Sequence, residues 1–253
     1  PLAPGGGADS VTRNLAASFS EAFAQTVVVD NRPGAGSLVA LQTLADAAPD
    51  GHTLIVVAAG FAVNPSLRKT LPYDSVRDFA PVGLVGTGPY LLVIHASIPA
   101  KTVAEFIAWG KARPGEISYA STGVGSPPHL AMELLKTMTG VNFTHIPYKG
   151  GGAALNAILA GETQVYFAPV GVALSNIQER RMRALAVSTA RRVSLTPDLP
   201  TLAEAGVVGY ESGNWYGMVV PAKTPPAVVS VLRAAALSVL NNATTVKRMQ
   251  DFG

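Results

Sequence analysis

The sequence predicts an α/β fold divided into two lobes, and three observations lead to this prediction. Short apolar runs alternate with helical patterns along the whole chain. Several of these runs are almost entirely apolar, as in parallel strands that helices cover on both faces. The tetrapeptide P-A-K-T occurs twice, starting at Pro99 and at Pro221.

The apolar runs mark the expected strands. They are residues 27–29, 53–58, 90–94, 117–120, 143–146, 164–168 and 184–188. Between them, apolar residues recur at helical spacing. Residues 11–23 predict a first helix with Asp9 as its N-cap, and residues 154–159 predict another. Leu130, Leu134 and Met138 recur every four residues and predict a helix that buries this stripe and ends at Gly140.

The two P-A-K-T copies indicate where the chain passes between lobes. Each copy follows an apolar strand and precedes a helix. Thr102 and Glu105 form a capping box in the first copy, and Thr224 leads into Pro225-Pro226 in the second. We interpret the repeat as two crossings at equivalent places, with lobe one at 1–97 and 220–253 and lobe two at 98–219.

Composition excludes several classes of function. The chain has 253 residues, of which 48% are hydrophobic and 14% charged, and a net charge of +3 gives no reason to expect a nucleic-acid partner. The apolar runs are shorter than the ~18 residues that span a bilayer. The chain has no cysteine, and its four histidines lie singly, without metal-ligand spacing. We therefore expect no metal site and no cofactor.

Four glycine-rich or small-residue loops follow the expected strands or precede the expected helices. They are 3–9, 58–65, 121–128 and 148–154. Glycine allows a ligand to approach the backbone, and helix N-termini offer free N–H groups. In an open sheet such loops lie at the carboxyl ends of parallel strands, where ligands bind. We expect these loops to hold a carboxylate, because no phosphate-binding motif is present.

An enzyme of the α/β class is the alternative that the residues leave open. Ser126 or Ser121 would be the nucleophile, and His129, three residues after Ser126, would be the base. Ser126 also fits the N-cap position before Pro127, and we identified no acid near His129 to orient it. We therefore expect no catalytic residue.

The order of these motifs resembles the Bug family, the periplasmic substrate-binding proteins of tripartite tricarboxylate transporters. The similar segments are "PGGGAD" (4–9), "VVVDNRPGAGS" (27–37), "APDGHTL" (48–54), "NPSL" (64–67), "LPYD" (71–74), "DFAPVGLV" (78–85), "ISYASTGVGSPPHLA" (117–131), "IPYKGGGAAL" (146–155), "RALAVST" (183–189) and "LPTLAEAG" (199–206). The resemblance implies a two-lobed periplasmic-binding-protein fold of the Venus-flytrap kind, type II-like, with two crossover strands. It also implies that a small carboxylate is captured in an interlobe cleft and delivered to a membrane permease.

The loops and the resemblance together give the predicted ligand-binding residues. They are Gly6, Gly7, Ala8, Gly60, Phe61, Ser121, Thr122, Gly125, Ser126, Gly150, Gly151, Ala168 and Pro169. Ala168 stands where many relatives have an aspartate, which would pair with a ligand ammonium group. We therefore expect a mono- or dicarboxylate, with Phe61 favouring an aromatic acid, rather than an amino acid. We also expect a periplasmic monomer whose native chain continues at both ends.

Overall fold

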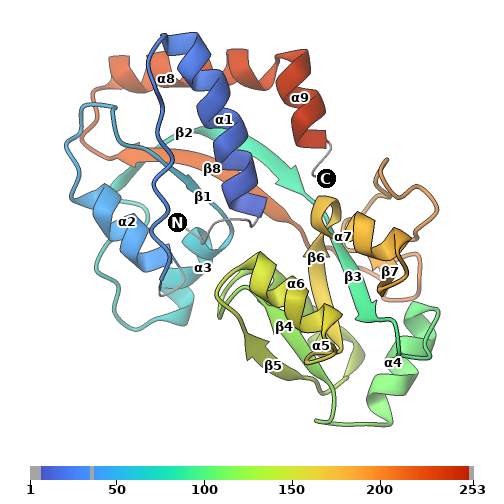
Figure 1. Cartoon of the computed structure of the whole chain (residues 1–253). Coiled ribbons are helices and arrows are strands. Elements are labelled where there is room, and N and C mark those ends of the chain that lie inside the picture. The colour runs from blue at the N-terminus through green and yellow to red at the C-terminus, as the bar shows by residue number, and fades with distance from the viewer. Residues whose placement is uncertain (1–6, 35–36, 251–253) are drawn as a thin grey trace. The chain divides into compact units, whose positions relative to one another are not determined.

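The computed structural model describes residues 7–34 and 37–250, and this part of the chain forms two compact units (Figure 1). Unit 1 contains residues 7–34, 37–87 and 215–250, and unit 2 contains residues 88–214. The units divide at 87/88 and 214/215, whereas the P-A-K-T repeat led us to expect 97/98 and 219/220. The first division falls where one extended run continues into another, with Pro89 between them.

Unit 1 is a three-stranded sheet with helices on both faces. Its strands are β1 (Ile55–Val57), β2 (Phe79–Gly88) and β8 (Asn214–Pro221), in the order β1-β8-β2. Its helices are α1 (Gly7–Phe23), α2 (Leu38–Ala45), α3 (Gly60–Leu67), α8 (Pro226–Leu240) and α9 (Ala243–Gln250). One core cluster joins Leu15 and Phe19 of α1 to Met218 of β8, and a second joins Leu41 of α2 to Val219. Because successive residues of β8 face opposite sides, each face of the sheet has its own core.

Unit 2 is a five-stranded sheet. Its strands are β3 (Tyr90–His95), β4 (Ser118–Ser121), β5 (Thr144–Pro147), β6 (Val165–Pro169) and β7 (Met182–Val187). Their order is β5-β4-β6-β3-β7. β4 pairs in parallel with β5 and β6, whereas β3 is antiparallel to both β6 and β7. β4, β5, β6 and β7 therefore run in one direction, and their carboxyl ends meet at one edge of the sheet.

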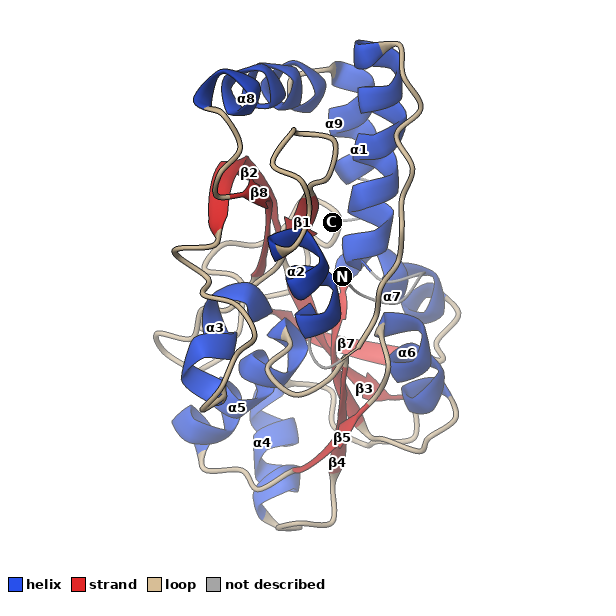
Figure 2. Ribbon diagram, turned by 90° about the vertical axis from the view of Figure 1, so that its left-hand side faces the viewer, coloured by secondary structure: helices blue, strands red, loops and turns tan. Residues whose placement is uncertain are grey.

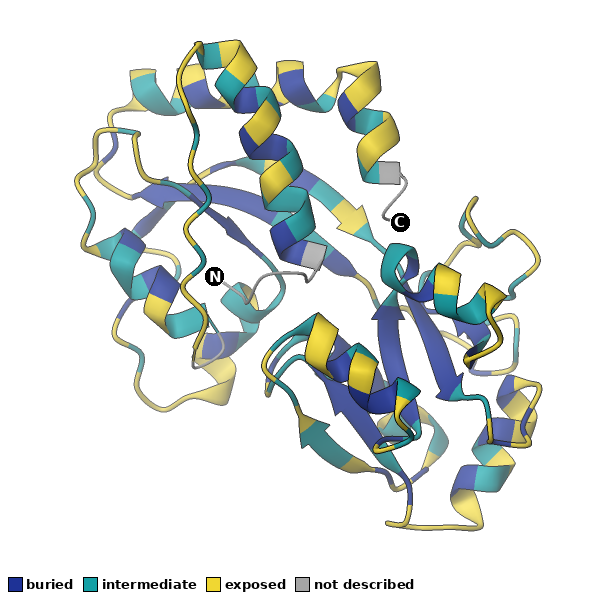
Figure 3. Cartoon of the chain, in the orientation of Figure 1, coloured by how far each residue is buried: buried dark blue, intermediate teal, exposed yellow. Residues whose placement is uncertain are grey.

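Two helices cover each face of the unit 2 sheet (Figure 2). The helices are α4 (Val103–Lys111), α5 (Pro127–Thr139), α6 (Gly151–Leu159) and α7 (Val170–Gln178). Tyr119 of β4 packs in the cluster with α4 and α5, and the next residue, Ala120, packs in the cluster with α6 and α7. The strands are largely buried between these helix layers (Figure 3). This confirms the expected α/β class and its doubly covered strands. The parallel direction expected for such strands is wrong for β3, which is antiparallel to both neighbours, and for β1, which pairs antiparallel with β8.

Some local predictions are confirmed. Thr102 is the N-cap of α4, and its Oγ1 accepts a hydrogen bond from the Glu105 N–H at 3.1 Å. Gly140 ends α5 with a left-handed φ of 74°, as a C-terminal glycine commonly does.

Three other local predictions are wrong. Residues 27–29 are not a strand, and no described strand pairs with them. Asp9 is not an N-cap because α1 already begins at Gly7; its carboxylate accepts hydrogen bonds from Arg13 and Asn31 instead. The buried face of α5 is not the predicted one, since Met138 is 39% exposed. The residues that the helix buries are Pro127, Pro128, Ala131, Met132 and Leu135.

No single helix among residues 7–34 and 37–250 has the length and apolar character needed to cross a membrane. The segments Pro226–Leu240 and Ala243–Met249 meet that test only as a pair, and the pair is bent by 75°.

Candidate functional site

Three helices of unit 2 begin at the same edge of its sheet. β4 ends at Ser121, β5 at Pro147 and β6 at Pro169, and these strands are followed by α5, α6 and α7. α5 packs on one face of the sheet, whereas α6 and α7 pack on the other. The connections after the adjacent strands β4 and β6 therefore leave toward opposite faces, which is the arrangement that creates a ligand-binding crevice in open α/β sheets.

The three helix starts differ in the hydrogen-bond donors that they offer. The first two residues of α5, Pro127 and Pro128, have no N–H, so this helix start is poor in donors. α6 begins with Gly151, Gly152 and Ala153, and no described group accepts a hydrogen bond from their N–H groups. A Cβ on Gly152 would have no atom within 4 Å. The start of α6 thus offers three N–H groups without a partner in the described chain and open space at Gly152, together with the positive end of the helix dipole.

The loop between β4 and α5 is a tight, glycine-dependent turn. Gly123 has a φ of 124° and Gly125 a φ of 76°, conformations that side chains with a Cβ disfavour. The Ser126 N–H donates to the Gly123 carbonyl at 3.1 Å, and the Gly125 N–H donates to Nδ1 of His129 at 3.3 Å. The two glycines are therefore required by the backbone conformation of the turn. Lack of space is not the reason at Gly123, because no atom lies within 4 Å of a Cβ placed there.

The Ser121 hydroxyl is fully occupied within this turn. Its Oγ accepts from the Gly123 N–H at 3.1 Å, lies 3.1 Å from the Gly123 carbonyl oxygen and lies 2.6 Å from Nε2 of His145. A hydroxyl has one donor and two acceptor positions, so these three contacts use its capacity. Ser121 is also completely buried. In this structure its side chain organises the turn.

The hydroxyls of Thr122 and Ser126 remain uncommitted. Ser126 is the N-cap of α5, as expected, but its side chain makes no capping hydrogen bond. Pro128, at the second helical position, has no N–H to donate, and the structure gives no hydrogen bond from the His129 N–H at the third position to Ser126 Oγ. Ser126 Oγ is buried and has no hydrogen-bond partner in the described chain, and the structure gives no hydrogen bond to the Thr122 side chain.

Two histidines lie beside the turn, although the sequence places them 16 residues apart. The rings of His129 on α5 and His145 on β5 have centroids 4.2 Å apart, and the Tyr119 ring stacks on His145 at 4.8 Å. Burial, together with the neighbouring His129, lowers the pKa of His145 to about 4. Burial, together with Lys136, also lowers the pKa of His129. Both imidazoles are therefore neutral at pH 7 and add no positive charge to the site.

An acidic residue that the sequence reading overlooked lies one turn after His129. Glu133 accepts hydrogen bonds from the Tyr119 hydroxyl at 2.5 Å and from Lys136 at 2.7 Å. Burial opposes its ionisation, but the hydrogen bonds from Lys136 and Tyr119 outweigh burial and lower the pKa of Glu133. The carboxylate is thus paired with tyrosine and lysine rather than hydrogen-bonded to His129.

The remaining predicted residues divide between the units. Gly150 is the N-cap of α6 with a φ of 109°, and Pro169 is the N-cap of α7, so both lie at the same edge as the Ser121 turn. Ala168 is completely buried in β6, opposite Leu91.

The other predicted residues belong to unit 1 or fall outside the described part. Gly60 and Phe61 begin α3, where the Phe61 ring packs edge-on against Phe79 at 5.5 Å. Gly7 begins α1, and Ala8 is 5% exposed. Gly6 lies outside the described residues.

The contact between Ser121 and His145 is not among the contacts that the sequence predicts. A signal was present in the strand alternation, because Tyr119 and Ser121 share one face of β4 and His145 lies opposite Tyr119 in the parallel register. Without the strand order, however, nothing in the sequence shows that these two strands are neighbours.

A mostly parallel sheet covered by helices on both faces, with helix starts gathered at one edge and in one of two compact units, is an architecture that solute-binding proteins use. The chain belongs to the tripartite tricarboxylate transporter family of receptors, whose family model matches residues 11–253.

Individual relatives agree with this membership. The chain is 34% identical to BugT of Bordetella pertussis over 255 residues, which covers all of this chain and 78% of that protein. It is similar in structure to R. palustris Rpa4515 with adipate, with a TM-score of 0.96, 34% identity, and coverage of 100% of this chain and 85% of that one. It is also similar to MatC from Rhodopseudomonas palustris with bound malate, with a TM-score of 0.92, 33% identity, and coverage of 100% and 86%.

The two-lobed fold and the receptor class expected from the sequence are thereby confirmed. The hydrolase alternative finds no support in these comparisons. The serine–histidine pairs of that alternative are not formed in the described chain, because Ser126 Oγ has no hydrogen-bond partner and Ser121 Oγ contacts His145 rather than His129.

Proposed function

We propose that this receptor works in the periplasm, binds a small carboxylate at the carboxyl edge of the unit 2 sheet and delivers it to the membrane permease of its transporter. The observation that carries the proposed site is the start of α6, where three N–H groups have no partner in the described chain. An anion at such a helix start gains hydrogen bonds and a favourable interaction with the helix dipole. Family membership and the carboxylate-bound relatives support the choice of anion.

Hydroxyl groups near this edge complete the proposed site. Thr122 and Ser126 have uncommitted hydroxyls on the neighbouring turn, and each hydroxyl can donate a hydrogen bond. We assign Ser121 a positioning role, because His145 and Gly123 already occupy its hydroxyl. Gly125 and Gly150 act through their backbone conformation, which holds the turn and the start of α6 in place.

The ligand that we propose has no ammonium group. The segments at this edge, 121–128, 147–153 and 168–172, contain no aspartate or glutamate. A buried or half-buried ammonium group without a carboxylate partner would lose its hydration without compensation. Ala168 is buried within the sheet and provides no charge. A mono- or dicarboxylate fits this chemistry better than an amino acid does.

A binding role without turnover is also part of the proposal. The family and its structural neighbours are solute-binding proteins. The hydrogen bond between Ser121 and His145 holds the turn after β4 in place, which is a structural role. Replacing His129 by alanine separates the two roles: a receptor still binds its acid stoichiometrically, whereas an enzyme that uses this base loses turnover.

Calorimetric titration with a panel of acids tests the proposal. The panel contains adipate, malate, benzoate, aspartate and glutamate, and each sample is assayed afterwards for consumption of the acid. We expect saturable binding of one class of plain carboxylate, a higher melting temperature in its presence, and no consumption. Tighter binding of aspartate or glutamate than of malate would contradict the argument about the ammonium group.

A further inference from the structure

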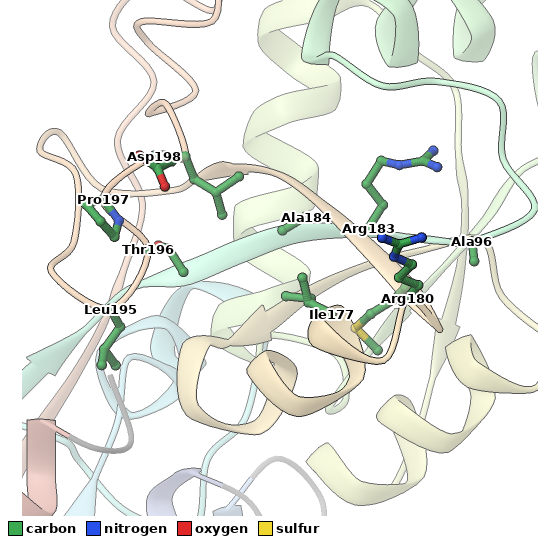
Figure 4. Close-up of a pocket in the computed structure, with 11 residues that line it drawn as sticks. Ala96, Ile177, Arg180, Arg183, Ala184, Leu195, Thr196, Pro197 and Asp198 are labelled. Atoms are coloured by element: carbon green, nitrogen blue, oxygen red, sulfur yellow. The ribbon is translucent and has the colours of Figure 1, made fainter.

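A second concave surface lies in unit 2, away from the candidate ligand site. It is a groove of about 600 Å³ along the outer side of β7 (Figure 4). The end of α7, the start of β7 and the loop 195–199 line it. The lining includes the apolar side chains of Ile177, Met182, Leu195 and Leu199. We call this surface the β7 groove.

The β7 groove and the proposed carboxylate site of unit 2 lie at opposite ends of the unit 2 sheet. β7 runs in the same direction as β4 and β6, because β3 is antiparallel to both β6 and β7. The groove is lined by Met182 and Ala184, at the start of β7. The proposed carboxylate site lies where β4, β5 and β6 end. A partner in the groove therefore leaves the ligand loops of this unit uncovered.

The backbone of β7 is free along the groove. β7 is the last strand in the sheet order, and β3 is the strand with which it pairs. On its outer side, the bridge that the described chain makes is between Val187 and Thr201, at the other end of the strand. The outer edge at Met182–Ala184 thus has unpaired backbone groups, to which an extended chain can add as a further strand.

The charge of the β7 groove is positive at one end. Five of the chain's twelve arginines lie between residues 180 and 192. Arg180 and Arg183 line the groove, and Figure 4 shows both at one end, with Asp198 on the loop at the other. The Arg183 guanidinium is fixed by hydrogen bonds to the carbonyls of Ile98 at 3.0 Å and Ala100 at 2.7 Å.

Of the two arginines that line the β7 groove, Arg180 is the one whose side chain has no partner among the described residues. Its side chain is exposed and makes no ion pair or hydrogen bond to the described residues. Its φ of 58° places it in the left-handed region, which ends α7 and turns the chain directly into β7. An accessible guanidinium beside an open strand edge favours a partner with carboxylate side chains.

We propose that the β7 groove docks an extended, acidic segment of a partner protein, which pairs with the free edge of β7 and places a carboxylate on Arg180. The identity of that partner as the membrane permease rests on the proposed function. Apolar side chains that alternate with the acidic ones fill the space lined by Ile177, Met182 and Leu195.

The test uses a fluorescent, blocked peptide in which glutamate and valine alternate, and a matched peptide with lysine in place of glutamate. Binding to the full chain is measured by anisotropy. We expect saturable binding of the acidic peptide alone. Arg180→Glu should weaken it by at least about tenfold, whereas Arg191→Glu, the same charge change outside the groove lining, should alter it by less than about twofold.

Several outcomes would overturn the docking proposal. They are binding of both peptides or of neither, an unchanged affinity in Arg180→Glu, and equal losses in the two variants, which would indicate long-range attraction alone. Two alternative occupants are tested with the same variants: a second copy of the chain by sedimentation, and anionic vesicles of phosphatidylglycerol by pelleting. Arg180-dependent association with either occupant would also refute the proposal.

Calorimetry of the same samples with the panel acids keeps the two proposals separate. Absence of peptide binding in the unaltered chain, with intact carboxylate binding, defeats the docking proposal alone. Absence of carboxylate binding in the unaltered chain defeats the proposed function, whatever the peptide does.

Discussion

Replacing Gly151 by proline removes one backbone N–H from the start of α6 and adds no charge. Proline is well tolerated at the first position of a helix. Gly150, which precedes it, has a ψ of 171°, an extended value that suits a residue before proline. A hydrogen bond to a charged acceptor contributes about 1.5 to 3 kcal/mol, so affinity for the carboxylate should fall by roughly 10- to 150-fold.

Titration calorimetry on the tightest-binding acid of the panel measures this loss. Ala243→Pro is the matched control, because it makes a proline change at the first position of α9, a helix of unit 1 outside the proposed site. We expect the control to bind within about twofold of the original chain. An unchanged affinity in Gly151→Pro, with an unchanged melting temperature without ligand, would show that the start of α6 does not hold the carboxylate.

Three predictions concern stability in the absence of ligand. Thr102→Ala removes the N-cap of α4 and should lower the free energy of unfolding by about 1 kcal/mol in urea; no change would deny the cap its role. Gly110→Ala places a Cβ 2.7 Å from the buried Phe143 ring and should cost about 1 to 3 kcal/mol, whereas Gly152→Ala should cost nothing. His145 has its pKa lowered to about 4 by burial, from an ordinary value of 6.5, so the unfolded chain takes up a proton between these values and the folded chain does not. Stability is therefore complete above pH 6.5 and falls as the pH is lowered toward 4, and His145→Asn should show a smaller fall in melting temperature across that range; an equal fall would contradict the assignment.

Local signals in the sequence predicted much of the fold. Apolar runs gave the positions of β3, β4, β6 and β7, since a strand covered on both faces must be apolar whatever its neighbours are. The N-cap at Thr102 and the glycine at the end of α5 were readable because capping depends on a few adjacent residues. The buried face of α5 was not readable, because it depends on the angle at which the helix meets the sheet.

The backbone conformation at the candidate site was partly predictable from the sequence, because it also depends on adjacent residues. The glycine-rich loops contain Gly125 and Gly150, whose φ values of 76° and 109° lie in a region that favours glycine. The functions of the hydroxyl groups were not readable. Ser121 and Ser126 look alike in sequence, yet one is occupied by His145 and the other has no partner.

The sequence by itself determined the α/β class and the glycine-dependent loops, because both follow from composition, order and local conformational preference, and it indicated the family through the resemblance of its motifs. The tertiary structure decided which donors are free. It placed β5 beside β4, which brings His145 to Ser121, and it left β7 at the edge of the sheet with an arginine-lined groove. Strand order depends on long-range pairing between segments far apart in the chain, and no local pattern of residues encodes it.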